Sequence, residues 1–157
     1  MSLRDHAQIA TPIGVISVTV DGPVLTAVRI GAGSVSRGTS ALLAEALDQL
    51  NQYFAGERHA FDLPLAPAAT PRGGALRAGI TGIGYGQTAS YGDLARMFAS
   101  SPRAIGQACA RNPFPIIVPC HRVLAANGAL GAYSAGEGPA TKTWLIAHER
   151  HHLGDRQ

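Results

Sequence analysis

A cysteine and a histidine stand side by side at Cys120 and His121. The thiolate is the reactive form of cysteine, and a nearby imidazole favours it, so the pair can act as nucleophile and base. Neighbouring side chains diverge along an extended chain, so His121 needs a bent backbone or a bridging water to serve Cys120. Glu149 is the best carboxylate available to orient the histidine. Because most unpaired cysteines are small buried apolar residues, the dipeptide alone leaves both interpretations open.

The N-terminal part of the chain has the pattern of a small sheet followed by a helix. Apolar and small residues alternate from Ile9 to Ile30 around Asp21-Gly22-Pro23, which predicts a β-hairpin with its turn at Asp-Gly. Thr39 or Ser40 can then cap a helix that ends at Gly56.

A stretch rich in proline, alanine and glycine follows, from residue 63 to 74, and predicts an irregular linker. We therefore expect an N-terminal α/β domain over residues 1–68 and a second domain over residues 69–157. Residues 1–70 carry four arginines against six acids, whereas residues 71–157 carry nine basic residues against four acids. A basic second part suggests that it meets a polyanion.

Two short helices are predicted after the linker, with little strand signal. Ser90 precedes an amphipathic segment over residues 91–98, and Ser100-Ser101-Pro102 ends it and starts a second helix over residues 103–110. Asn112-Pro113 closes the second helix. The arrangement fits a helix-turn-helix, although an ordinary helical hairpin has the same pattern.

Composition narrows the classes of protein. Of the 157 residues, 46% are hydrophobic and 15% charged, which favours a packed core over disorder. No run of eighteen apolar residues predicts a membrane span, and the first residues lack an apolar signal core, so we expect a cytoplasmic protein without a membrane partner. The two cysteines make no disulfide framework, and Cys109 is expected to pack rather than react. The histidines near the C-terminus do not complete a convincing metal site.

Several motifs, in this order, resemble the O6-alkylguanine-DNA alkyltransferases, the methylated-DNA–protein-cysteine methyltransferases. The resemblance covers nearly the whole chain and is strongest over residues 83–149. Its motifs are Tyr53-Phe54-Ala55-Gly56, Leu63-Pro64-Leu65, Ser90-Tyr91-Gly92-Asp93-Leu94-Ala95, Arg103-Ala104-Ile105-Gly106, Asn112-Pro113, Pro115, Ile116-Ile117-Val118-Pro119-Cys120-His121-Arg122-Val123, Gly128, Leu130-Gly131, Tyr133, Lys142 and Trp144-Leu145-Ile146-Ala147-His148-Glu149.

The resemblance implies an α+β fold: a ribonuclease H-like N-terminal sheet with a helix, then a helical domain with a winged-helix-like helix-turn-helix. It also implies direct DNA repair without a cofactor or metal. Cys120 would take the alkyl group from guanine O6 once and remain alkylated. His121, oriented by Glu149, would deprotonate the thiol through a water. Tyr91 would supply a proton to the leaving guanine, and Asn112 would brace the active-site turn.

The same resemblance implies a substrate pocket and a DNA surface. The substrate-binding residues would be Pro115, Val123, Tyr133, Ser134 and Lys142. The residues facing DNA would be Arg103, Ala104, Gly106, Gln107 and Arg111. The target base must leave the stack, at a cost of a few kcal/mol, and Arg103 would enter the vacated space. We expect a monomer in solution that binds the minor groove of double-stranded DNA containing O6-alkylguanine; O4-alkylthymine is a plausible second substrate.

The chain departs from the family pattern at several positions. Arg72 and Arg77 replace an apolar aromatic residue and a tryptophan, and Gly84 replaces a proline. The turn around residues 100–102 is about two residues shorter than usual, and the loop over residues 134–141 is about two residues longer. These changes bear on the packing of the helix after the linker and on the size of the alkyl group accepted.

Two other classes of function stay open. A cysteine hydrolase could use Cys120, His121 and Glu149 as an acyl-transfer triad and would turn over repeatedly. A non-catalytic relative could recognise alkylated guanine without reacting. Such relatives replace the cysteine, which is present here.

Overall fold

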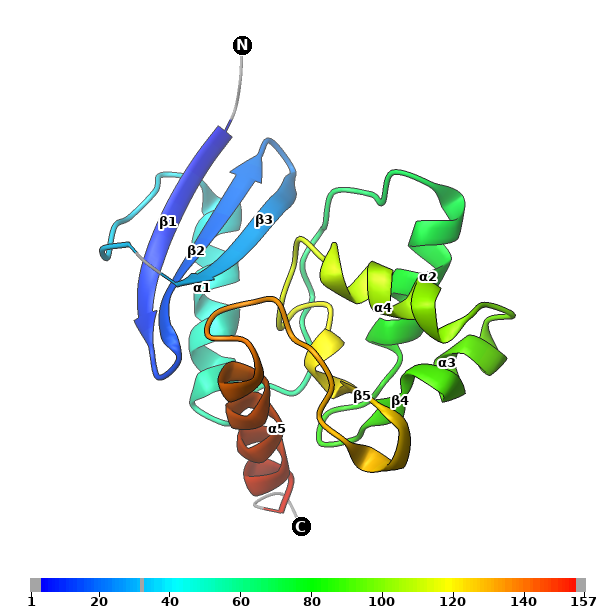
Figure 1. Cartoon of the computed structure of the whole chain (residues 1–157). Helices are drawn as coiled ribbons and strands as arrows, with labels where there is room; N and C mark the ends of the chain where they lie inside the picture. Colours follow the sequence, from blue (N-terminus) through cyan, green and yellow to red (C-terminus); the bar gives the residue numbers. More distant parts are fainter. Residues whose placement is uncertain (1–3, 32, 155–157) are drawn as a thin grey trace. The chain divides into compact units, whose positions relative to one another are not determined.

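Two compact units make up the chain, Met1–Ala66 and Pro67–Gln157 (Figure 1). The structure is a computed structural model that describes residues 4–31 and 33–154. The first unit combines a sheet with a helix, and the second is mainly helical, as the predicted α+β class requires. Within the described residues, no helix is both long and apolar enough to cross a membrane.

A three-stranded antiparallel sheet forms the first unit, with β1 (Arg4–Thr11), β2 (Gly14–Asp21) and β3 (Val24–Gly31) in chain order. The buried residues of β2 are its apolar residues at every second position, Ile16, Val18 and Val20. The predicted β2–β3 hairpin and its turn after Asp21 are confirmed. The sequence pattern did not indicate that a third strand, β1, begins at Arg4.

Helix α1 (Ala41–Phe54) packs on β1 and β2. Its N-cap is Ser40, whose side chain accepts a hydrogen bond from the backbone N–H of Leu43, so the predicted cap is confirmed. The Asp5 carboxylate of β1 accepts hydrogen bonds from the backbone N–H groups of Thr39 and Ser40, at 2.6 and 3.0 Å. The start of the helix is thereby attached to the sheet.

The prediction that all of residues 63–74 are irregular is wrong. The backbone of Leu25 pairs with Pro64 and Ala66, each at 2.8 Å, and this extends the sheet of the first unit. Helix α2 (Pro71–Thr81) already begins inside the supposed linker. Proline is well suited to the first turn of a helix, where its missing N–H costs nothing. Thr70, the N-cap, accepts a hydrogen bond from the N–H of Gly73 in that same turn.

The second unit contains both predicted short helices, α3 (Tyr91–Met97) and α4 (Pro102–Ala110), packed against each other as a helix-turn-helix. Ser90 and Asp93 form a reciprocal capping box at the start of α3. Ser101 caps α4 by accepting from the N–H of Ala104. Helix α2 packs on α4.

Two strands that the sequence did not predict connect this helix pair to the segment that contains Cys120 and His121. The strands β4 (Ala89–Ser90) and β5 (Val123–Leu124) pair in parallel. The 3₁₀ helix η1 (Cys120–Arg122) directly precedes β5, and a second one, η2 (Ala126–Gly128), follows it. The last described element is α5 (Pro139–Gly154), which packs on η1 and supplies Glu149.

Candidate active site

The turn that leads to Cys120 is unusual in its backbone. Ile116 lies at its centre with φ +76°, although it is β-branched and only 1% exposed. Such a conformation costs on the order of 1–3 kcal/mol and persists only where surrounding contacts hold it. The Asn112 amide provides them: its nitrogen donates to the carbonyl of Val118 at 3.0 Å, and its oxygen accepts from the N–H of Phe114 at 2.9 Å. From its sequence, the same stretch is only an apolar run.

The nucleophile candidate begins η1, where the backbone bends. Cys120 is 4% exposed. The Asn112 amide nitrogen lies 3.4 Å from its sulfur and is oriented to donate. One side chain therefore holds the turn and also places a hydrogen-bond donor on the thiol.

His121 forms a buried pair with Glu149, with 2.6 Å between His121 Nε2 and Glu149 Oε2. The Glu149 carboxylate can only accept, so Nε2 carries the proton and the lone pair of a neutral ring is on Nδ1. Nδ1 is buried and has no hydrogen-bond partner among the residues the structure describes. The ring is thus oriented by one nitrogen and left with a free base at the other.

Arg122 completes this cluster, and sequence reasoning did not assign it a role. Its guanidinium donates to both oxygens of Glu149, at 2.8 and 3.0 Å, and to the carbonyl of Ile83 at 2.6 Å. The N–H of Gly86 reaches the same carboxylate at 3.3 Å. A buried arginine inside an apolar motif was the available signal, because such a charge requires a partner. Its partner, however, is far away in the sequence.

Protonation states follow from these contacts. Burial alone would raise the pKa of Glu149, but the hydrogen bonds and charges of His121 and Arg122 outweigh it and hold that pKa well below the usual range. Burial lowers the pKa of His121, against the opposing effect of Glu149, so the ring is neutral at neutral pH. A hydrogen bond with Cys109, together with burial, raises the pKa of the Cys120 thiol. The Cys120 thiol is therefore protonated at rest and would need a base in order to act as a nucleophile.

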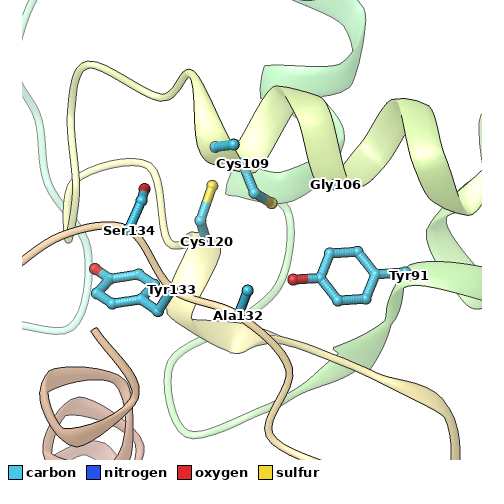
Figure 2. Close-up of a pocket in the computed structure, with 8 residues that line it drawn as sticks. Tyr91, Gly106, Cys109, Cys120, Ala132, Tyr133 and Ser134 are labelled. Carbon is cyan, nitrogen blue, oxygen red and sulfur yellow. The ribbon is translucent and has the colours of Figure 1, made fainter.

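A cavity of about 140 Å³ opens at the Cys120 sulfur (Figure 2). An apolar cavity of roughly 150 Å³ holds a benzene-sized ring, so this one has room for part of a base. The Tyr91 hydroxyl points into the space that the two cysteines face. Cys109, expected to pack rather than react, also lines this cavity. The lining residues are Tyr91, Gly106, Cys109, Ala110, Cys120, Ala132, Tyr133 and Ser134.

The predicted substrate-binding residues divide into two groups. Tyr133 and Ser134 line the cavity, whereas Pro115, Val123 and Lys142 are not among its lining residues. Lys142 is buried, and its ammonium donates to the carbonyls of Val123 at 2.7 Å and Ala132 at 3.2 Å. It therefore joins the strand after the nucleophile to the loop that forms one side of the cavity.

The predicted DNA-facing residues lie on or next to α4. Arg103, Gln107 and Arg111 are exposed, while Ala104 and Gly106 are half-buried. A groove of about 670 Å³ adjoins the cavity and shares Tyr91, Gly106 and Ala132 with it. Its other lining residues are Ser90, Gly92, Arg96, Pro102, Ala125, Ala126 and Asn127.

The two arginines that depart from the family pattern make defined contacts. Arg72 donates to the carbonyl of Ala99 at 3.0 Å, in the turn between α3 and α4. The Arg77 guanidinium lies over the Phe114 ring, 5.2 Å from its centre, beside the strained turn. Within the described part of the chain, no three histidine, cysteine, aspartate or glutamate side chains are grouped so as to hold a metal ion.

These features together define a reactive-thiol protein built on a helix-turn-helix. Two family models match the chain: the ribonuclease-like domain of 6-O-methylguanine DNA methyltransferase over residues 6–67, and its DNA-binding domain over residues 75–151. The chain belongs to the 6-O-methylguanine DNA methyltransferase family.

Individual relatives agree over most of their length. A methylated-DNA–protein-cysteine methyltransferase of Mycolicibacterium paratuberculosis is 34% identical, over 94% of this chain and 93% of that protein. A DNA base-flipping protein of Thermus thermophilus is 39% identical, over 88% of this chain and 95% of that protein. The crystal structure of Mycobacterium tuberculosis OGT in complex with DNA superposes with a TM-score of 0.81 at 35% identity, covering 94% of this chain and 93% of that one.

Proposed function

We propose that this protein repairs DNA by moving the alkyl group of O6-alkylguanine onto Cys120, once per molecule. The observation that carries the proposal is the arrangement at Cys120: a thiol at a cavity, on a turn held by Asn112, followed by the buried His121–Glu149 pair. Membership of a family of 6-O-methylguanine DNA methyltransferases supports the same chemistry.

The thiol is activated by proton removal. His121 Nδ1 takes the Cys120 proton through a bridging water, and Glu149 stabilises the resulting imidazolium. The thiolate attacks the alkyl carbon, so a carbon–sulfur bond forms as the bond from carbon to guanine O6 breaks. The product is a thioether, which has no leaving group for water to displace under ordinary conditions. The protein is therefore consumed by the reaction.

The leaving guanine needs a proton, and we expect the Tyr91 hydroxyl, which lines the cavity, to give one. Burial raises the pKa of the Tyr91 hydroxyl, which keeps it protonated until guanine leaves. Tyr133 and Ser134 line the cavity on the side away from Tyr91 (Figure 2) and would enclose the base. Lys142 and Val123 would act indirectly, by holding the loop that carries Ala132.

The substrate is proposed to be double-stranded DNA, approached from the minor groove by α4. A base inside the stack cannot reach a thiol that is 4% exposed, so the alkylated nucleotide must rotate out of the duplex. Arg103 would fill the vacated space, Ala104 and Gly106 would permit close approach, and Gln107 and Arg111 would contact the backbone.

We further propose that the protein acts as a monomer in the cytoplasm, without a cofactor. A single chain contains the nucleophile, the base and the carboxylate. Both cysteines are free thiols, and a reducing compartment is needed to keep Cys120 in the form that reacts.

The test is intact-mass measurement after incubation with duplex DNA that contains O6-methylguanine. We expect the mass of one added methyl group, located on Cys120 by peptide mapping, and no further addition with excess DNA. Cys120→Ser should stay unmodified, and Cys109→Ser is the matched control that keeps the nucleophile.

Two results would contradict the proposal. An unmodified wild-type protein that still binds the lesion would favour a protein that recognises alkylated guanine without reacting. The relative from Thermus thermophilus is named a DNA base-flipping protein. Repeated turnover of an ester, with an acyl group on Cys120, would favour a cysteine hydrolase.

A further inference from the structure

The alkyl-acceptor mechanism uses one of two thiols that line the same cavity. Cys109 lies near the end of α4, and Cys120 begins η1. Figure 2 shows the side chains of both cysteines directed into the same space, and both residues line the cavity. Nothing in the proposed repair chemistry requires a second thiol at this place.

We propose that Cys109 and Cys120 are a peroxide-responsive thiol pair that closes into a reversible disulfide. The cavity that both line is large enough for a molecule of the size of hydrogen peroxide. Both cysteines belong to the same unit, and only ten residues separate them in the chain. A reactive thiol beside a second thiol is the arrangement in which oxidation ends as a disulfide.

The chemistry begins at Cys109. Its hydrogen bond with Cys120 lowers the pKa of the Cys109 thiol, although burial opposes the shift, so Cys109 is the first of the two to ionise. The Cys109 thiolate attacks one peroxide oxygen; an S–O bond forms, the O–O bond breaks, and hydroxide leaves and takes up a proton to become water. Cys120 then attacks the sulfenic sulfur of Cys109. An S–S bond forms, the S–O bond breaks, and a second water leaves with the Cys120 proton.

A reversible disulfide would matter for this protein because each molecule can accept only one alkyl group. Oxidation of a solitary Cys120 to sulfinic acid would destroy an unused molecule, because that step is not reversed by thiols. A disulfide with Cys109 would block alkyl transfer, but a dithiol reductant would restore it. The effect on alkyl transfer rests on the proposed function, whereas formation of the disulfide does not.

The sequence allows a direct test. Trypsin cuts after Arg103, Arg111 and Arg122, so the cysteines fall on different peptides, Ala104–Arg111 and Asn112–Arg122. After treatment of the reduced protein with hydrogen peroxide, we expect an intact mass lower by two hydrogen atoms. Digestion without reductant should yield these two peptides joined, and dithiothreitol should separate them.

Two variants make the test specific. In Cys120→Ser, the oxidised Cys109 has no partner, so dimedone should label the peptide Ala104–Arg111. In Cys109→Ser and Cys109→Ala, peroxide should lower the rate of alkyl transfer, and dithiothreitol should not restore it. The rate of each variant is compared with that of the same variant before treatment. In the wild-type protein, dithiothreitol should restore most of the activity.

Three outcomes would overturn the inference: sulfenic or sulfinic acid on separate wild-type peptides, a disulfide that joins two protein molecules, or equal recovery of wild type and Cys109→Ser. If the joined peptides form in a protein that never accepts an alkyl group, the thiol pair stands and the proposed function fails.

Discussion

Glu149 and Arg103 are both charged residues of the second unit, in opposite surroundings. Glu149 is 1% exposed and accepts hydrogen bonds from His121, Arg122 and Gly86. Arg103 stands in the exposed first turn of α4. The carboxylate is held in one position before any substrate arrives, whereas the arginine is free to meet a partner.

The difference separates two tasks. Groups that move a proton must be positioned within tenths of an ångström, and burial with full hydrogen bonding achieves this. Groups that meet a polyanion act largely through charge in water, where flexibility costs little and salt weakens the attraction. Variants of the buried cluster should therefore impair reaction with any alkyl donor. Variants of the α4 surface should impair only reaction with duplex DNA.

The largest effect is expected from Glu149→Gln. It leaves His121 without its charged partner and Arg122 as an uncompensated buried charge. Alkyl transfer should fall on the order of 10²- to 10⁴-fold with both duplex DNA and free O6-benzylguanine, as general-base catalysis is lost. The free energy of unfolding should fall by about 3–5 kcal/mol. Single-turnover rates and urea denaturation measure both; the exposed Glu137→Gln is the control, and a loss confined to duplex DNA would contradict the assignment.

Arg103→Ala tests the other side of the comparison. Reaction with O6-methylguanine in duplex DNA should slow by about 10- to 100-fold, because the variant loses a group that offsets part of the few kcal/mol needed to extrude the base. Reaction with free O6-benzylguanine should change far less. Arg150→Ala, which removes an exposed charge from α5, is the control. Equal losses on the two substrates would remove Arg103 from the DNA-facing role.

Acid should lower the free energy of unfolding, because His121 and Glu149 of the buried cluster take up protons. The pKa of folded His121 lies below its normal value of 6.5, so the unfolded chain binds more protons and stability falls as pH drops below that value. Glu149 has a pKa below its normal 4.5, so its stabilisation is present above that pH and is lost as the pH falls further. Each group contributes a slope of at most about 1.4 kcal/mol per pH unit.

Urea denaturation between pH 7 and pH 4 measures this slope. His121→Gln should remove the part that begins near pH 6.5 and reduce the part due to Glu149 to what the Arg122 contact alone maintains. An unchanged slope in that variant would mean that another group titrates there.

The smallest effect is expected from Gly106→Ala. A methyl group at this position meets no atom of the protein within 4 Å, and alanine should stabilise α4 by about 0.5–1 kcal/mol. The same methyl group would stand between α4 and the DNA, so repair of duplex DNA should slow several-fold. Gly74→Ala in α2 also meets open space and should stabilise without slowing repair. Thermal denaturation and repair rates distinguish the two variants.

Local signals predicted the helices well. Ser40, Ser90 and Pro102 lie at helix starts as the sequence indicated, because capping depends on residues within one turn of each other. Helix α2 was hidden because Gly73 and Gly74 interrupt its first turns and its apolar periodicity is weak. Thr70 and Pro71 were the only local signals for its start.

Long-range pairing accounts for the rest. The strands β4 and β5 have two residues each, too few for an alternating pattern, and their partners are 34 positions apart. The contact between Arg122 and Glu149 spans 27 positions, and Cys109 and Cys120 line the same cavity although they belong to different elements. The motif identified Cys120, His121 and Glu149 as candidates. It could not indicate how these long-range contacts hold them.

The short pairing of β4 with β5 limits how this protein could be re-engineered. Ser90 caps the first helix of the helix-turn-helix, and the same residue pairs with Leu124, four positions after the nucleophile. A designer who replaced the helix-turn-helix by a different module, next to the turn that carries Cys120, would cut this connection. The helix pair that we propose to meet DNA and the turn that carries Cys120 should therefore be exchanged together.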